Sequence, residues 1–221
     1  MLIHKIPPFF VKCLLLPCQA ESLIVVLLLL LLVCRKGQLA FKTLLFVAFC
    51  VVVNVALKFT FQVPSHLTTA KGIFAFPSGH MQFSTVFYGW IAYHFHKYSG
   101  YSKDSKDSFE RVQGPIENFK IYLIYTFLML ILLSVGSGLV IAGYHSTLDV
   151  IGGWVVGTLL VISLGLIEIT MPRYMPILVA TIATACMIYI PFQYAPIPEH
   201  AWWTYQITML LSVLWVGYQT K

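Results

Sequence analysis

The chain has 221 residues, of which 59% are hydrophobic and only 10% are charged. Soluble domains carry about 25% charged residues, so this composition excludes an ordinary water-exposed surface and indicates that lipid surrounds most of the molecule. The formal net charge of +6 comes from basic residues dispersed between apolar runs. This pattern argues against nucleic-acid binding, which uses clustered basic residues. The length predicts one membrane-embedded domain, residues 1–221.

Seven apolar stretches are candidates for membrane spans, each of which needs about 20 residues. In chain order they cover residues 17–34, 39–62, 79–96, 120–143, 147–168, 174–192 and 202–219. All are predicted to be helices, because a segment in hydrocarbon must satisfy its backbone hydrogen bonds internally. Glu21 interrupts the first and weakest stretch, and residues 7–20 are candidates for an interfacial segment. The expected fold is an all-α, polytopic transmembrane bundle of six to seven spans.

The connections between these stretches alternate between two faces of the membrane. One face has the connections near residues 35–38, 97–120 and 169–173 and the C-terminus, and it carries most of the lysines and arginines. The other face has the N-terminus and the remaining connections, where Lys5, Lys12 and Lys71 are the basic residues. Basic residues accumulate on the cytoplasmic side, so this second face is predicted to be extracytoplasmic.

Four ionisable residues lie at the ends of apolar stretches on that second face: Lys58, His80, His145 and Asp149. Ionisable groups in such places are costly and are by default functional candidates. The alternation of the stretches delivers all four to the same side of the membrane, although they are as many as 91 positions apart. The sequence therefore predicts a shared site there.

The local patterns around these residues suggest anion chemistry. Residues 76–80, Phe-Pro-Ser-Gly-His, stand where a helix is expected to begin, and free backbone N–H groups at a helix start form an anion site. His145 and Asp149 are four apart, hence on one helical face. A carboxylate so placed orients an imidazole, as in nucleophile–base pairs. Lys58 offers a point charge for phosphate.

Other polar residues have plainer interpretations. His94, His96 and His200 are interpreted as capping or interfacial groups. Asn54 is interpreted as an interhelical hydrogen-bonding residue. The glycines of the fifth stretch, Gly152, Gly153 and Gly157, are interpreted as sites of close helix packing. The five cysteines show no spacing typical of a zinc or redox site.

The chain resembles the type 2 phosphatidic acid phosphatase (lipid phosphate phosphatase) superfamily over about residues 55–157. Residues 77–80, Pro-Ser-Gly-His, match the family's second motif fully. Residues 138–149, which end in His145-Ser-Thr-Leu-Asp149, keep the histidine and aspartate of the third motif. The first motif is reduced to Lys58 with residues 64–66, Pro-Ser-His.

The resemblance implies a mechanism and a substrate class. His145 would attack phosphorus and form a phosphohistidine, Asp149 would orient it, and His80 would protonate the leaving lipid oxygen. The phosphate would be held by Lys58, Ser78 and the amide of Gly79. Water would resolve the intermediate, with no metal and no other cofactor. The implied partners are a phosphorylated lipid and the bilayer, and the oligomeric state is left open.

Two departures from the family pattern stand out. The arginines of its first and third motifs fall at Ser65 and Leu139 in this chain, so both bidentate phosphate clamps are missing. Lys71 and His66, in the same outer connection, are candidate substitutes.

Three functional hypotheses follow from these residues. The first is a phosphatase acting on a lipid phosphate or lipid pyrophosphate. The second is a lipid phosphotransferase similar to sphingomyelin synthases, because a phosphodiester carries one negative charge and suffers less from the missing arginines. The third is a catalytically inactive lipid-binding relative, although such a protein has no need for the His145–Asp149 pair.

Overall fold

The computed structural model describes residues 7–33, 36–65, 74–99, 115–193 and 197–219. Within these ranges the chain is helical apart from short connections and one isolated antiparallel bridge between Pro64 and Phe74. The longer helices are α3 (Gly37–Phe61), α4 (Gly79–Ser99), α5 (Pro115–Ile141), α6 (Thr147–Thr170), α7 (Met175–Gln193) and α8 (Glu199–Gln219). The predicted all-α class is confirmed.

The first predicted span is not one continuous helix. Its helical structure begins earlier, with α1 (Pro8–Leu15) and the 3₁₀ turn η2 (Leu16–Cys18), and resumes in α2 (Ala20–Leu28) and the π-helical turn η3 (Leu29–Val33). The two parts are bent by 46°. Pro17, inside the 3₁₀ turn, has no backbone N–H to continue the α1 ladder. The predicted helix over residues 17–34 is therefore confirmed for residues 20–33, and the bend lies at its start.

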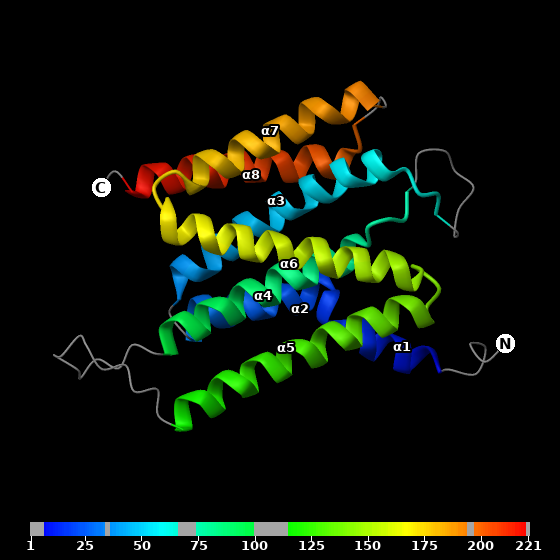
Figure 1. Cartoon of the computed structure of the whole chain (residues 1–221), viewed down its shortest axis with the longest axis horizontal. Coiled ribbons are helices and arrows are strands. Elements are labelled where there is room, and N and C mark those ends of the chain that lie inside the picture. The colour runs from blue at the N-terminus through cyan, green and yellow to red at the C-terminus, as the bar shows by residue number, and fades with distance from the viewer. Residues whose placement is uncertain (1–6, 34–35, 66–73, 100–114, 194–196, 220–221) are drawn as a thin grey trace.

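The longer helices lie lengthwise beside one another, and their connections gather at two opposite ends (Figure 1). At one end α3 begins and α6 turns into α7; at the other α3 ends and α5 turns into α6. The alternation predicted from the sequence is confirmed for these connections. Helix α4 is central, because it packs against α3, α5 and α6.

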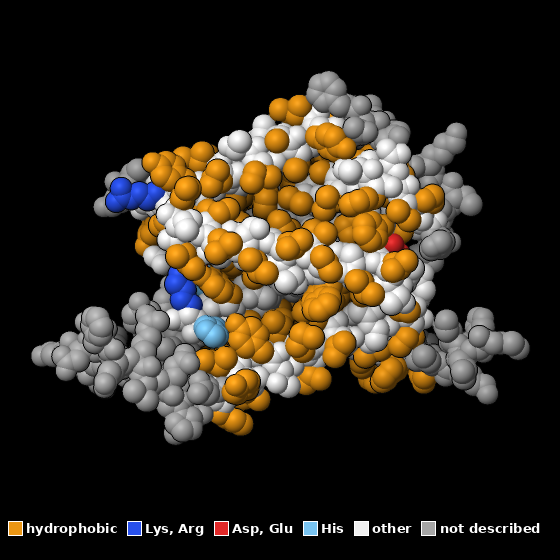
Figure 2. All heavy atoms as spheres, in the orientation of Figure 1, with side chains coloured by type: hydrophobic (Ala, Val, Ile, Leu, Met, Phe, Trp, Pro, Cys, Tyr) orange, Lys and Arg blue, Asp and Glu red, His pale blue; other side chains and the backbone are white. Residues whose placement is uncertain are grey.

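Hydropathy and surface character both fit a membrane environment. Among the described residues, three helical segments are long and apolar enough to cross a bilayer, namely Gly37–Phe61, Phe119–Ile141 and Thr147–Thr170, and the bent α1–α2 pair makes up to four. Hydrophobic side chains are spread over the described part of the face seen in Figure 2, between backbone and other side chains, with few charged groups among them. Phe127 and Leu159, for example, are more than half exposed. Such a surface is stable only in lipid.

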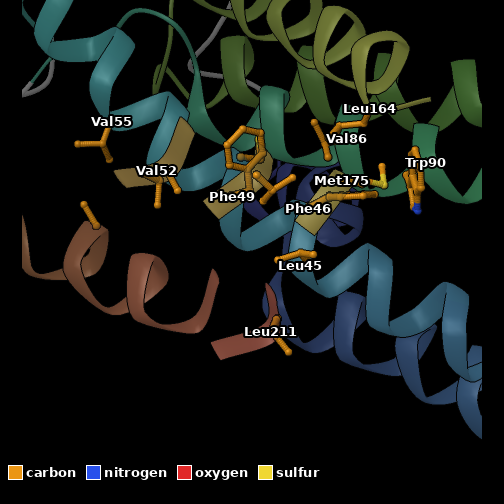
Figure 3. Packing of buried hydrophobic residues seen from close by; sticks show 14 of the residues in the cluster. Leu45, Phe46, Phe49, Val52, Val55, Val86, Trp90, Leu164, Met175 and Leu211 are labelled. Carbon is orange, nitrogen blue, oxygen red and sulfur yellow. The ribbon is translucent and has the colours of Figure 1, made fainter. Parts of the chain in front are cut away.

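The main hydrophobic core surrounds α3, where α4, α6, α7 and α8 meet (Figure 3). At its centre the rings of Phe46 and Trp90 pack edge to face, with centroids 4.5 Å apart. A second, smaller cluster joins α4, α5 and α6 and contains Met81, Val135 and Leu139.

A buried ion cluster ties α3, α4 and α6 together near the end where α6 turns into α7. The carboxylate of Glu168 pairs with Lys42 of α3, with His94 at 3.3 Å and with Lys97 at 3.4 Å. His94 is buried, with 2% of its side chain exposed. Its interpretation as a capping or interfacial group is wrong, because Glu168 supplies an acidic partner inside the bundle. His96, two residues on, is exposed.

Glycines allow α4 and α6 to approach closely. A Cβ added at Gly153 would lie 2.5 Å from the Ser78 carbonyl oxygen, and one at Gly157 would lie 2.8 Å from the Gln82 carbonyl oxygen. Real Cβ atoms essentially never come under 3.0 Å. The interpretation of these glycines as close-packing sites is confirmed. Their close contact with the backbone at Ser78 and Gln82 fixes where α4 begins relative to α6.

We expect Gly153→Ala to destabilise the protein by about 1–3 kcal/mol, because the added methyl group meets backbone that cannot rotate away. Thermal unfolding in detergent measures this. Gly217→Ala is the matched control, since nothing lies within 4 Å of a Cβ at that position in α8. Equal stability of the two variants would contradict the close-packing account.

Candidate active site

The start of α4 is fixed by the buried residue Ser78. Its hydroxyl lies 3.5 Å from the Met81 N–H, which donates to it and so caps the helix. Its backbone N–H donates to the Asp149 carbonyl at 2.9 Å, across to α6. Gly79 and His80 therefore occupy the first turn of α4, where backbone N–H groups have no helical partner.

The turn between α5 and α6 holds His145. Gly143 has φ +73°, a conformation that glycine adopts without strain, and the Tyr144 N–H then bonds to the Leu139 carbonyl at 3.0 Å. Helix α6 begins at once with a capping box: the Asp149 N–H donates to the Ser146 hydroxyl at 3.2 Å, and the Ser146 N–H donates to Asp149 Oδ2 at 2.8 Å. His145 stands between these two caps.

Asp149 therefore contacts two groups, the backbone of Ser146 in the helix cap and the ring of His145. Its Oδ2 lies 3.8 Å from His145 Nδ1, which is an ion-pair distance but too long for a hydrogen bond. Asp149 is buried, and His145 Nδ1 has no hydrogen-bond partner among the described residues. The sequence reasoning missed the cap, although the Ser-x-x-Asp spacing of residues 146–149 is a recognisable signal for it.

Lys58 reaches the site from the last turn of α3. Its Nζ donates to the Phe74 carbonyl at 2.8 Å, so the amine is anchored beside the segment that leads into α4. Phe74 is itself held by the bridge to Pro64. This contact positions the charge without neutralising it, because a carbonyl carries only a partial negative charge.

One cavity of about 1110 Å³ brings these groups together. Lys58, Gly79, His80 and His145 all line it. Ser78 and Asp149 do not line it and are buried. Both histidines therefore line one cavity, together with the amine of Lys58.

The two positions of the missing arginines are also described. Leu139 lines the cavity, is buried with 1% of its surface exposed, and belongs to the second apolar cluster. Ser65 is half-buried. The proposed substitutes, Lys71 and His66, lie outside the described residues. Among the described lining residues, Lys58 is the single lysine or arginine.

The family model that matches the chain is the PAP2 superfamily, over residues 39–168. This chain belongs to the PAP2 superfamily. The match runs from the start of α3 to Glu168 near the end of α6, so it contains all the candidate residues named from the sequence motifs. No curated protein and no solved structure gives a match.

Members of the PAP2 superfamily are typically phosphatases or phosphotransferases that act on phosphorylated substrates. The apolar helices and the family together make this chain an integral membrane protein. The helices α1, α2, α7 and α8 lie outside the matched range.

Several residues of this PAP2 protein's cavity were not assigned to the site from the sequence. Asn54, expected to make an interhelical bond, donates to the Pro77 carbonyl at 3.3 Å and to Gln82 Oε1 at 2.8 Å, which confirms that expectation. It also lines the cavity, as do Glu21 and His200. The sequence signal for Glu21 was that a charged residue interrupts the first apolar stretch.

His145 is held in its neutral form. Burial of the ring, reinforced by the positive charge of Lys58 and by His80, lowers the pKa of His145 to about 4, against the opposing effect of Asp149. A neutral imidazole keeps a lone pair on one nitrogen, as a nucleophile requires.

This lowered pKa predicts an acid-sensitive fold. The unfolded state binds more protons than the folded state between about pH 4 and the ordinary value of 6.5, so stability is complete above that window and falls as the pH drops through it. On acidification, we expect wild type to lose more stability than His145→Gln, by a difference on the order of 2 kcal/mol. Unfolding of wild type and variant at neutral and acidic pH measures it, with His96→Gln as control. Identical acid profiles for all three proteins would contradict a neutral, buried His145.

Proposed function

We propose that this protein is a membrane-bound hydrolase that removes phosphate from a lipid phosphate or lipid pyrophosphate through a phosphohistidine intermediate. The observation that carries the proposal is the shared cavity, in which His80, His145 and Lys58 face the same space. Family membership supports phosphoryl chemistry in general. The distribution of lysines and arginines favours the extracytoplasmic face for the site.

In the proposed reaction His145 is the nucleophile. Its Nδ1 faces Asp149 Oδ2 at 3.8 Å, which leaves Nε2 to attack phosphorus. The N–P bond forms as the P–O bond to the lipid breaks, and His80 gives a proton to the departing lipid oxygen. Water then attacks phosphorus and gives a proton to His80, the N–P bond breaks, and inorganic phosphate leaves.

The phosphate is held by groups at the start of α4 and the end of α3. The Gly79 amide lies in the first turn of α4, where the helix dipole also favours an anion. Lys58 supplies a full positive charge at the end of α3. Because Ser78 is buried and does not line the cavity, we assign it the placement of Gly79 and His80 instead of its predicted phosphate contact.

The lipid character of the substrate is supported by the cavity walls. Apolar side chains from helices α1 to α5 and from the segment before α4 line the space, among them Leu15, Leu23, Phe59, Phe74 and Phe83. Such walls bind acyl chains, and the surrounding surface is suited to lipid. A phosphorylated lipid entering from the bilayer fits this arrangement.

A second candidate function is transfer of a phospho-head-group between lipids. The observation that favours it is the absence of both motif arginines, since Leu139 and Ser65 cannot neutralise a phosphomonoester dianion. A phosphodiester has one negative charge and needs less compensation. In this reaction an acceptor lipid alcohol replaces water in the second step.

A panel of lipid phosphates, pyrophosphates and phosphodiesters tests the proposal, with phosphate and lipid products detected separately. We expect inorganic phosphate from at least one phosphorylated lipid. Labelled head group on an acceptor lipid, without free phosphate, supports transfer instead. Turnover of no lipid by well-folded protein supports an inactive lipid-binding relative.

A further inference from the structure

The cavity contains a carboxylate that the proposed reaction does not use. Glu21, in the first turn of α2, lines the same space as Lys58, His80 and His145. It is exposed, and it has no hydrogen-bond or ion-pair partner among the described residues. An unpaired carboxylate facing a phosphate site repels the phosphate, so its presence there calls for a positive counterpart from the substrate.

The bend between α1 and α2 supplies this carboxylate. The break at Leu16–Cys18 ends α1 and starts α2 two residues later, and both sides of the break line the cavity. Leu15 precedes the break, while Gln19 and Glu21 follow it. This whole segment precedes residue 39, where the family match begins, so it lies outside the matched range.

The charges of the described lining residues are balanced without a substrate. Lys58 contributes one positive charge and Glu21 one negative charge, and the described wall contains no arginine. A phosphate group and an ammonium group on one ligand would each meet an opposite charge in this cavity. A phosphate group alone would pair with Lys58 and leave the negative charge of Glu21 without a positive counterpart in the described wall.

We infer that Glu21 binds an ammonium group of the substrate, so that this protein selects lipids in which an amine lies close to the phosphate. The inference rests on the proposed function and names its substrate class. Two kinds of lipid share this chemistry: phosphodiesters with an ammonium head group, and phosphomonoesters of lipids with a free amine on the backbone. Glu21 acts as a specificity-determining residue and takes no part in bond making.

Two matched pairs of lipids test the inference and separate these sources. Phosphatidylethanolamine is compared with phosphatidylglycerol, and sphingosine 1-phosphate with its N-acylated form, in mixed micelles. In the pair that contains the substrate type, we expect wild-type kcat/KM to be about tenfold higher for the amine-bearing lipid, equivalent to about 1.4 kcal/mol. Glu21→Gln should bring this ratio to about one, and Glu21→Lys should reverse it.

The control variant is Glu199→Gln, which changes an exposed carboxylate in the first turn of α8 that does not line the cavity. It should keep the wild-type ratio. Glu21 also stands in the first turn of a helix, where a negative charge is stabilising. A role of that kind alone would lower thermal stability and leave the lipid ratio unchanged, which would overturn the inference.

Failure of the proposed function has a different signature. If wild-type protein turns over neither these four lipids nor any other lipid of the panel, the hydrolase proposal fails, and the inference is then decided by binding to the four lipids. We expect the amine-bearing lipid to raise the unfolding temperature of wild type more than its partner does, and Glu21→Gln to abolish that difference. Equal protection by both lipids of each pair would overturn the assignment of Glu21.

Discussion

Replacement of His145 by alanine is expected to lower the rate of phosphate or head-group release by at least about 10³-fold, because removal of a nucleophile removes the covalent pathway. The cavity, with Lys58 and the Gly79 amide, remains in the variant, so lipid binding should change much less than turnover. A steady-state assay on the best lipid of the panel measures both effects, as kcat and KM.

The intermediate itself provides a second measurement. Rapid quenching of wild type with a lipid labelled at phosphorus should leave label on the protein that survives base and is lost in acid, as expected for a phosphoramidate. His145→Ala should carry none. His96→Ala is the matched control, since His96 is exposed and contacts only Tyr125, at 3.4 Å, among the bonds described. A His145→Ala protein with more than a tenth of wild-type activity would exclude the nucleophile assignment.

Replacement of Glu168 by methionine is expected to destabilise the protein by about 3 kcal/mol or more. The variant leaves His94 and the two lysines without their shared carboxylate inside the bundle. Lys97 is the most exposed partner, with 35% of its side chain accessible, so its charge can be rehydrated and contributes least to the cost. Chemical or thermal unfolding in detergent measures the change.

A double variant separates lost pairing from lost packing. Lys42→Met combined with Glu168→Met replaces a buried ion pair by apolar side chains of similar length, and such replacements are often neutral. We expect the double variant to recover part of the stability lost by Glu168→Met alone. A double variant less stable than Glu168→Met alone would show that Lys42 also stabilises the bundle independently of Glu168, for example through the Trp215 ring that its Nζ approaches at 5.0 Å.

The sequence predicted the longer helices and the grouping of the motif residues, because both depend on features visible along the chain. Apolar length defines α3, α5 and α6, and simple alternation places His80 and His145 at the same end of the bundle. The capping box was equally visible in principle, since it is a local pattern of residues 146–149.

Features that depend on tertiary contacts were not predictable in this way. His94 has the sequence context of an interfacial residue, and only the packing of α6 against α4 reveals Glu168 as its partner. The bend before α2 and the position of Glu21 in the cavity wall depend on how the segment formed by α1 and α2 packs against the other helices. Hydropathy reports that a segment is apolar but not which side chains face inward.

The hydrogen bond from the Ser78 N–H to the Asp149 carbonyl joins main chain to main chain across the two helices that bear the histidines. No substitution of a side chain deletes either partner, apart from proline at position 78. The main-chain atoms that join the two helices here are therefore different from the side-chain atoms of the proposed reaction. Alanine at His80 or His145 should therefore yield an intact but stalled protein, suited to capturing its natural ligand from a membrane extract for identification by mass spectrometry.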